Sequence, residues 1–287
     1  MNGLRLFLQE IKIEHTLFAL PFAYAGALLA ARGVPSAHVL VWITLAVLGA
    51  RTAAMSANRL LDAKIDKKNP RTAGRAVASG KLPASTMIVA IVVGLVLLTL
   101  AAYELNPLCL ALLPIGAAGV IIYPLVKRWT WAVHFVLGAV DALAPLGAWI
   151  AVTGRFEPGA WLLFGAVTVW VAGFDILYAL MDHDFDVAEG ISSIPARFGS
   201  SAGRVVPQLL HASLVIALAA LGILTHVGAL YYVGVAAALA LLVYELSLIR
   251  LRRDVFSLNA AVFNANMAFS VVFLISTAAS IAVRGAL

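Results

Sequence analysis

The sequence contains few charged residues and almost no cysteine. Lysine, arginine, aspartate and glutamate together make up 12% of its 287 residues, about half of their share in a typical soluble domain. Such a chain has too little polar surface to cover a water-soluble core, which excludes an ordinary soluble globular protein. The single cysteine, Cys109, lies in an apolar stretch and excludes an internal disulfide.

Apolar residues fill most of the remaining positions. They account for 63% of the chain, and the mean hydropathy is +0.99. A helix that crosses a bilayer needs about 20 mostly apolar residues, and stretches of this length recur along the sequence. We therefore expect an all-α polytopic membrane protein with one transmembrane domain over residues 1–287. About nine spans are predicted, at 13–32, 37–59, 84–103, 107–125, 132–152, 158–181, 205–225, 228–249 and 259–283.

The positions of the basic residues predict the orientation. With a cytoplasmic N-terminus, Arg51 falls within a span and Arg32, Arg155 and Arg284 lie on the outer side, while every other lysine and arginine lies on the cytoplasmic side. Basic residues are enriched in cytoplasmic loops, so we expect this orientation in the cell (inner) membrane. The net charge of +6 then reflects topology and contact with the lipid bilayer, and no nucleic-acid partner is expected.

Two polar islands interrupt the apolar sequence. The first, "NRLLDAKIDKKNPRTAGR", begins at residue 58, and the second, "FDILYALMDHDFDVAEGISSIPARFG", begins at residue 174. Both carry side chains spaced i, i+4, i+8 at the predicted cytoplasmic end of a span, and both continue into a loop with glycine, serine and arginine. In the two islands these positions are Asn58, Asp62 and Asp66, and Tyr178, Asp182 and Asp186.

This spacing has a physical consequence for the carboxylates. Residues four apart on an α-helix lie one turn apart on the same face, where like charges repel. A bound cation removes that repulsion, and Mg²⁺ favours one or two carboxylates together with phosphate oxygens. The nearby lysines and arginines favour a metal–phosphate complex. The alternative is that both islands are solvated helix ends, which the matched spacing on one predicted side makes the weaker interpretation.

The two islands resemble a known family. "NRLLDAKID" matches the N-x-x-x-D-x-x-x-D motif, and "DILYALMDHDFD" the D-x-x-Y-x-x-x-D-x-x-x-D motif, of the UbiA-type intramembrane prenyltransferases. "NPRTAGRAVASGKL" and "GISSIPARFG" resemble the loops that follow these motifs, and "EHTLFALPFAYAGALLA" resembles the first helix of the family. The resemblance covers nearly the whole chain.

The resemblance implies a helical bundle around a central cavity that opens to lipid, with the two Asp-rich motifs at its cytoplasmic mouth. Two Mg²⁺ ions are implied, one held by Asn58, Asp62 and Asp66 and the other by Asp182 and Asp186. By their positions, Asp175 and Tyr178 would support the second cluster. Arg75 and Lys127 resemble the diphosphate-binding cations of the family, and we add Arg71 and Arg197 as further candidates. Tyr123 and Tyr178 are candidates to shield a prenyl cation, with ordinary packing as the alternative.

The implied activity is transfer of a prenyl group from a polyprenyl diphosphate to a small aromatic acid in quinone biosynthesis. "YALMDHDFD" and "GISSIPARFG" favour 4-hydroxybenzoate as the acceptor, and a dihydroxynaphthoate of menaquinone biosynthesis is the alternative. A CDP-alcohol phosphatidyltransferase requires a D-G-x-x-A-R stretch, which "ARTAAMSANRLLD" lacks. A secondary transporter would concentrate its polar groups near the middle of the bilayer, whereas here they gather at one end of the spans.

Arg51 is a charged residue inside a predicted span. A charge there is costly and usually faces a cavity or an ionic partner. We consider two roles: an anchor for the carboxylate of the acceptor, and a structural ion pair with Asp141 or Asp175. Asp141 itself is a candidate partner of Arg51, a cavity-lining residue or a proton acceptor.

Overall fold

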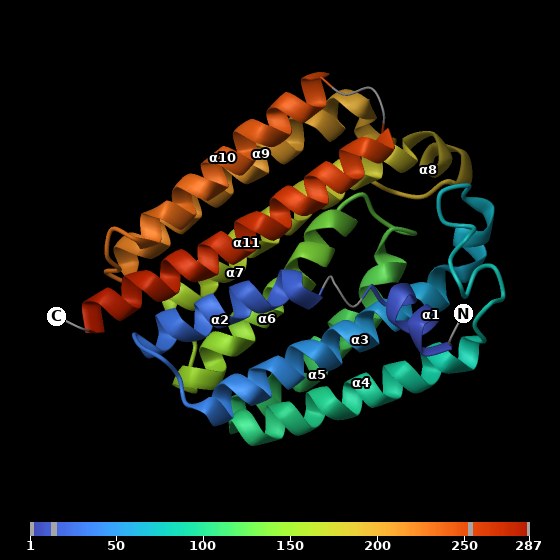
Figure 1. The fold of residues 1–287 in the computed structure, drawn as a ribbon. Coiled ribbons are helices and arrows are strands. Elements are labelled where there is room, and N and C mark those ends of the chain that lie inside the picture. Colours follow the sequence, from blue (N-terminus) through green and yellow to red (C-terminus); the bar gives the residue numbers. More distant parts are fainter. Residues whose placement is uncertain (1–2, 13–15, 252–254, 286–287) are drawn as a thin grey trace.

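The computed structural model describes residues 3–12, 16–251 and 255–285, and these form an all-helical bundle (Figure 1). In chain order the elements are α1 (Gly3–Glu10), α2 (Thr16–Ala31), α3 (Ala37–Lys68), α4 (Ala84–Leu105), α5 (Pro107–Val126), α6 (Val133–Thr153), α7 (Pro158–Ala179), the 3₁₀ turn η2 (Leu180–Asp182), α8 (His183–Glu189), α9 (Ile194–Leu224), α10 (Tyr231–Leu251) and α11 (Val255–Gly285).

Each predicted span coincides with one of these helices, except that residues 13–15 of the first predicted span lie outside the described residues. Within the described residues, seven helices are long and apolar enough to cross a membrane, and the apolar stretches Ala19–Ala31 and Tyr231–Glu245 are shorter. The polytopic all-α class is therefore confirmed, while nine as the number of spans stays a prediction. Two helices extend furthest beyond their predicted spans: α3 continues to Lys68, and α9 begins at Ile194 with a break at Gly199, where φ is +86°.

The helices follow one another around a ring. α3 packs against α4 and α5, α6 packs against α5 and α7, and α7, α9, α10 and α11 continue the circuit until α11 meets α2. Figure 1 shows α1, the connection from α3 to α4, and α8 at the same end of this bundle. The two polar islands, far apart in the sequence, are thereby brought to one end.

Small residues allow the closest helix contacts. A Cβ atom added to Gly94 of α4 would lie 2.6 Å from the carbonyl oxygen of Gly49 in α3, so only glycine permits this approach. Such contacts are typical of helix packing in lipid. On its other side α4 exposes a row of aliphatic side chains suited to lipid, namely Ile88, Val89, Val92, Val93, Val96 and Leu100.

A polar network lies inside the bundle between α7, α9, α10 and α11. Trp170 Nε1 donates to Asn266 Oδ1 over 2.6 Å, and Asn266 Nδ2 donates to Glu245 Oε1 over 2.8 Å. His211 Nδ1 lies 2.5 Å from Glu245 Oε2. All four side chains are buried, so the network fixes how these helices meet.

Candidate active site at the end of the bundle that carries both motifs

The last turns of α3 carry the first motif, and its central carboxylate is buried. Asp62 is only 1% exposed. Its Oδ2 atom accepts hydrogen bonds from Asn58 Nδ2 at 3.0 Å and from Lys127 Nζ at 2.5 Å. Its Oδ1 atom accepts none in the described part of the chain, and Arg128 Nη2 lies 3.9 Å from it. A buried carboxylate oxygen without a donor suits a cation.

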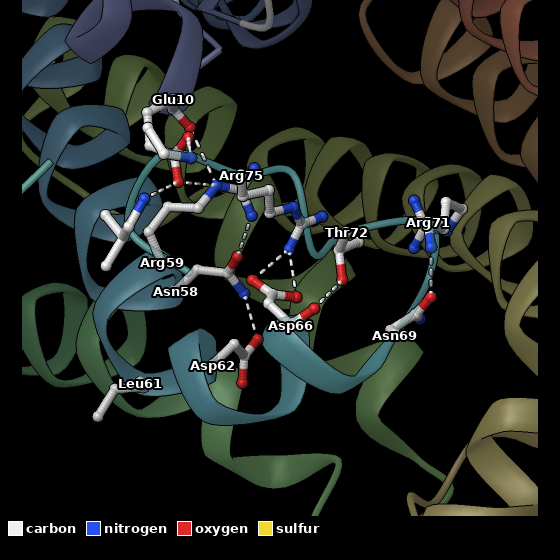
Figure 2. Close-up of polar contacts among 12 residues, drawn as sticks. Glu10, Asn58, Arg59, Leu61, Asp62, Asp66, Asn69, Arg71, Thr72 and Arg75 are labelled. Carbon is white, nitrogen blue, oxygen red and sulfur yellow. Dashed lines mark hydrogen bonds and ion pairs between the residues drawn. The ribbon is translucent and has the colours of Figure 1, made fainter. Parts of the chain in front are cut away.

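Asp66, one turn further along α3, faces the loop that follows. Arg75 Nη1 lies 2.7 Å from both carboxylate oxygens of Asp66, and Thr72 Oγ1 donates to the Asp66 carbonyl over 3.1 Å (Figure 2). The loop therefore folds back over the end of its own helix. Arg75 and Lys127, both candidates for binding diphosphate, each contact a motif carboxylate.

The second motif is not a continuous α-helical stripe as the first is. Tyr178 lies in α7, Asp182 in η2 and Asp186 in α8, because the chain passes through a 3₁₀ turn. Asp182 accepts hydrogen bonds from Asn69 Nδ2 at 3.0 Å and from Arg71 Nε at 2.8 Å. Asp186, which is mostly buried, accepts from Ser193 Oγ at 3.1 Å.

The two motifs converge on Arg71. Burial alone would lower the pKa of its guanidinium, but the hydrogen bonds and charge of Asp182 raise that pKa above its usual value, and the carboxylates of Asp66 and Asp186 add to the rise. Arg71 therefore lies within electrostatic reach of carboxylates from both islands. The end of α5 also contacts the loop of the second island, where Ser192 N donates a hydrogen bond to the Lys127 carbonyl over 2.8 Å.

The described residues contain no group of three or more acidic, histidine or cysteine side chains placed to enclose a metal on its own. Mg²⁺ does not require such a group, because it usually takes one or two carboxylates and completes its shell with water and substrate phosphates. The unpaired Oδ1 of Asp62 is one available oxygen. The Asn58 oxygen already accepts from Arg59 Nη1 at 2.8 Å, so its predicted metal contact would use the remaining lone pair.

Other predicted site residues lie around this centre. Asp175 Oδ2 lies 2.7 Å from His134 Nδ1, and His134 Nε2 accepts from Ile194 N at 3.2 Å, so Asp175 supports the segment that follows the second motif. Tyr178 packs against Phe174, with ring centroids 5.8 Å apart.

Tyr123 and Arg197 have less direct relationships to the carboxylates. The Tyr123 hydroxyl donates to the Ala54 carbonyl over 3.5 Å, and its ring belongs to a cluster between α3, α4, α5 and α6. Arg197 is exposed in the first turns of α9. Their predicted contacts with a prenyl cation and a diphosphate stay predictions.

Arg51 pairs with Asp141, and Asp175 instead pairs with His134. Arg51 Nη1 lies 3.0 Å from Asp141 Oδ1, while Arg51 Nε is buried and donates to no acceptor within the described residues. Both side chains line a cavity of about 500 Å³ between α2, α3, α4, α5, α6 and α7. Apart from this pair the wall is almost entirely apolar, and it reaches Leu105, Cys109, Phe156 and Trp161, where helices meet at the other end of the bundle.

Sequence reasoning missed several residues that hold the site together. Asn69 and Ser193 each bind a motif carboxylate, and both are predictable only as polar residues inside the two loops. Glu10 and Arg59 are buried beside the first motif. Arg59 resembled an ordinary cytoplasmic basic residue, and Glu10 gave no signal beyond its place at the end of a short amphipathic segment.

Comparisons with known proteins identify the family of the chain. The sequence profile of the UbiA prenyltransferase family matches residues 19–280. The chain is 36% identical over 261 residues to the 4-hydroxybenzoate octaprenyltransferase of Marinobacter nauticus, covering 90% of this chain and 88% of that protein. It is also 36% identical over 234 residues to the protein of the same name from Alkalilimnicola ehrlichii, covering 79% of this chain and 78% of that one.

Solved structures show the same fold. A UbiA homologue from Aeropyrum pernix matches with a TM-score of 0.83 and 33% identity, covering 95% of this chain and 98% of that one. A UbiA homologue from Archaeoglobus fulgidus bound to GPP and Mg²⁺ matches with a TM-score of 0.74 and 18% identity, covering 96% of this chain and 99% of that one. The chain therefore belongs to the UbiA prenyltransferase family and is a multi-pass membrane prenyltransferase.

Proposed function

We propose that this prenyltransferase transfers a polyprenyl group from its diphosphate to 4-hydroxybenzoate in ubiquinone biosynthesis. The observation that carries the proposal is the convergence of carboxylates and cations from both motifs at one end of the bundle, together with an apolar cavity that has Arg51 in its wall. The shared name of the relatives at 36% identity supports this acceptor. A dihydroxynaphthoate is the alternative acceptor.

The diphosphate of the donor binds between the motifs in this proposal. Asp62, Asp66, Asp182 and Asp186, with Asn58, would hold two Mg²⁺ ions, and these would neutralise charge on the leaving diphosphate. Arg75, Lys127 and Arg71 reach the same carboxylates, so their cationic groups are close enough to contact diphosphate oxygens. Arg197 is a further candidate from the start of α9.

The prenyl chain extends from the diphosphate into the apolar cavity. Arg51 precedes Asn58 by seven residues on α3, which corresponds to about 10 Å along a helix. A prenyl chain whose diphosphate lies at the motifs therefore passes Arg51 with its first isoprene units and reaches the cavity beyond. A wall of small and aliphatic side chains suits such a hydrocarbon.

The reaction breaks the bond between C1 of the prenyl chain and the diphosphate oxygen, and it forms a bond from C1 to a ring carbon of the acceptor. The ring then loses a proton, which balances the reaction. Arg75, Lys127 and Arg71 stabilise the negative charge that develops on the diphosphate. Tyr178 and Tyr123 offer their π faces to the allylic cation, with Asp175 fixing the segment around the second motif.

Arg51 binds the carboxylate of the acceptor in this proposal. Asp141 occupies only one nitrogen of the guanidinium, and the unpartnered Nε leaves donors for a second carboxylate. Asp141 then holds Arg51 in place. A carboxylate in this position places the aromatic ring of the acceptor between Arg51 and the motifs, next to C1 of the donor.

We also propose that the motif end faces the cytoplasm, as the basic residues predict, within one transmembrane domain over residues 1–287. Water-soluble aromatic acids would enter from that side, and the lipid donor would enter from the bilayer. Cysteine labelling of Ser79 and Gly154 variants in intact cells tests the orientation, because these positions lie in connections at opposite ends of the spans.

The deciding experiment is a transfer assay with the purified protein, geranyl diphosphate, Mg²⁺ and a panel of aromatic acids, with products identified by mass spectrometry. We expect a Mg²⁺-dependent prenylated 4-hydroxybenzoate. Transfer to 1,4-dihydroxy-2-naphthoate alone would assign the menaquinone branch, and no transfer to any aromatic acid would overturn the proposal.

A further inference from the structure

Glu10, the last residue of α1, lies buried beside the first motif without belonging to it. Its side chain is 6% exposed. Oε2 accepts a hydrogen bond from Ala76 N at 2.7 Å, and Oε1 accepts one from Val77 N at 3.3 Å. These two amides come directly after Arg75, so the carboxylate of Glu10 fixes the backbone from which the Arg75 side chain reaches Asp66 (Figure 2).

A second set of contacts leads from Glu10 to the metal motif through Arg59. Arg59 Nε donates to the Glu10 carbonyl over 3.0 Å and lies 3.9 Å from Glu10 Oε1. Nη1 of the same guanidinium donates to Asn58 Oδ1 over 2.8 Å. Asn58 in turn donates from Nδ2 to Asp62 over 3.0 Å. Arg59 thereby determines which end of the Asn58 amide points toward Asp62.

Apolar packing holds α1 in this position. Leu6 and Phe7 of α1 pack against a cluster formed by Ala76, Leu82 and Met87, together with Leu60 of α3. The contact joins α1 to the loop after the first motif and to the helix that carries the motif. This packing therefore holds Glu10 in the position from which it makes its polar contacts.

We propose that Glu10 is a positioning residue for the diphosphate site. It acts through Arg59 on Asn58 and Asp62, and through the amides of Ala76 and Val77 on Arg75. The inference rests on the proposed function of the motif end and extends it to α1, which lies outside both motifs. A carboxylate is needed because both acceptors must be oxygen atoms and because Arg59 is a buried cation that requires a nearby negative charge.

The principal test is Glu10→Gln. The glutamine amide has the same shape, but its NH₂ group faces either a backbone N–H or the Arg59 guanidinium, and both are donors. We expect binding of inorganic diphosphate with Mg²⁺, measured by isothermal titration calorimetry in detergent, to weaken by about 10- to 100-fold, the usual effect of removing a group that orients metal ligands. The donor KM should rise in parallel, whereas the acceptor KM should not change.

Two further variants make the test specific. Gln9→Ala alters the adjacent exposed residue of α1 and should leave diphosphate binding unchanged. Arg59→Lys keeps the positive charge, but its single ammonium group does not span the Glu10 carbonyl and Asn58, so it should weaken diphosphate binding as Glu10→Gln does. If Glu10→Gln yields no folded protein, Arg59→Lys decides the question.

The possible results separate the inference from the proposed function. Wild-type protein that binds magnesium diphosphate but prenylates no aromatic acid contradicts the proposed function alone, and the binding assay still tests the role of Glu10. The inference is overturned if either folded variant binds magnesium diphosphate as the wild type does. It is also overturned if the donor and acceptor KM rise together, because that pattern indicates general loss of structure.

Discussion

Asn69, in the connection after α3, donates a hydrogen bond from its side-chain amide to Asp182, which lies 113 positions later in the chain, over 3.0 Å. This contact joins the two polar islands directly. Arg71, two residues further on, also binds Asp182 through Nε at 2.8 Å. The loop after the first motif is thus attached to the second motif, and through Arg75 the same loop also contacts Asp66 of the first.

Loss of a single motif carboxylate should abolish transfer. We expect Asp62→Asn and Asp182→Asn each to eliminate Mg²⁺-dependent prenylation, because each removes negative charge where the metal–diphosphate complex binds, while the proteins stay folded in detergent. Asp184→Asn, at an exposed carboxylate of the second island, is the matched control and should retain activity. Product formation by mass spectrometry checks this, and full activity of both site variants would contradict the metal-site proposal.

The attachment of the loop to the second motif can be tested without substrates. Arg71→Gln removes the charged contacts with Asp182, so amide hydrogens of residues 71–82 should exchange faster with solvent in hydrogen–deuterium exchange. Lys68→Gln is the control, because the Lys68–Glu189 pair also links the two islands but lies largely in solvent, where ion pairs contribute about 0–1 kcal/mol. Equal exchange in both variants would show that Arg71 does not secure the loop.

Arg51→Lys should raise the KM for the acceptor more than the KM for the donor. Lysine keeps the charge but loses the planar fork that binds Asp141 and a second carboxylate together. Loss of a charged hydrogen bond costs about 1.5–3 kcal/mol, so we expect the acceptor KM to rise roughly 10- to 100-fold at an unchanged donor KM. A rise confined to the donor KM would instead assign Arg51 to the diphosphate or the prenyl chain.

The apolar cavity should limit the length of the donor. A Cβ atom at Gly147, in the cavity wall, would meet no atom within 4 Å, so Gly147→Leu fills open space without displacing the backbone. We expect this variant to use geranyl diphosphate normally and to lose activity with long polyprenyl diphosphates. Gly165→Leu is the control, since it adds the same side chain at an exposed and equally open position of α7. Equal use of long donors by both variants would exclude this cavity as the prenyl site.

The features that could be predicted from the sequence are those with a local or periodic signal. Long apolar runs predicted the helices, and the spacing of Asn58, Asp62 and Asp66 predicted that their side chains share one face of a helix, which α3 confirms by continuing to Lys68. The family motif placed the second set of carboxylates. The irregular backbone of the second motif could not be predicted in this way. The sequence spacing of the motif residues is the same whether residues 180–182 form a 3₁₀ turn or an α-helix.

The remaining contacts depend on packing between distant segments. The sequence offered Asp141 and Asp175 equally as partners of Arg51, and the choice is made by the position of α6 against α3, while Asp175 meets His134 across α7 and α6. Glu10 is similar, since its burial follows from the docking of α1 on the loop after α3. No local pattern specifies such tertiary contacts.

The buried network of Trp170, His211, Glu245 and Asn266 has a consequence for biogenesis. α10 places Glu245 inside the bundle. Its apolar stretch, Tyr231–Glu245, is nevertheless shorter than the seven helices that are long and apolar enough to cross a membrane. An acidic residue within a spanning helix costs up to about 2.5–3.5 kcal/mol during insertion. The partners of Glu245 lie on the helices synthesised before and after it. We therefore expect α10 to leave the translocon together with α9 and α11, as a unit of three helices.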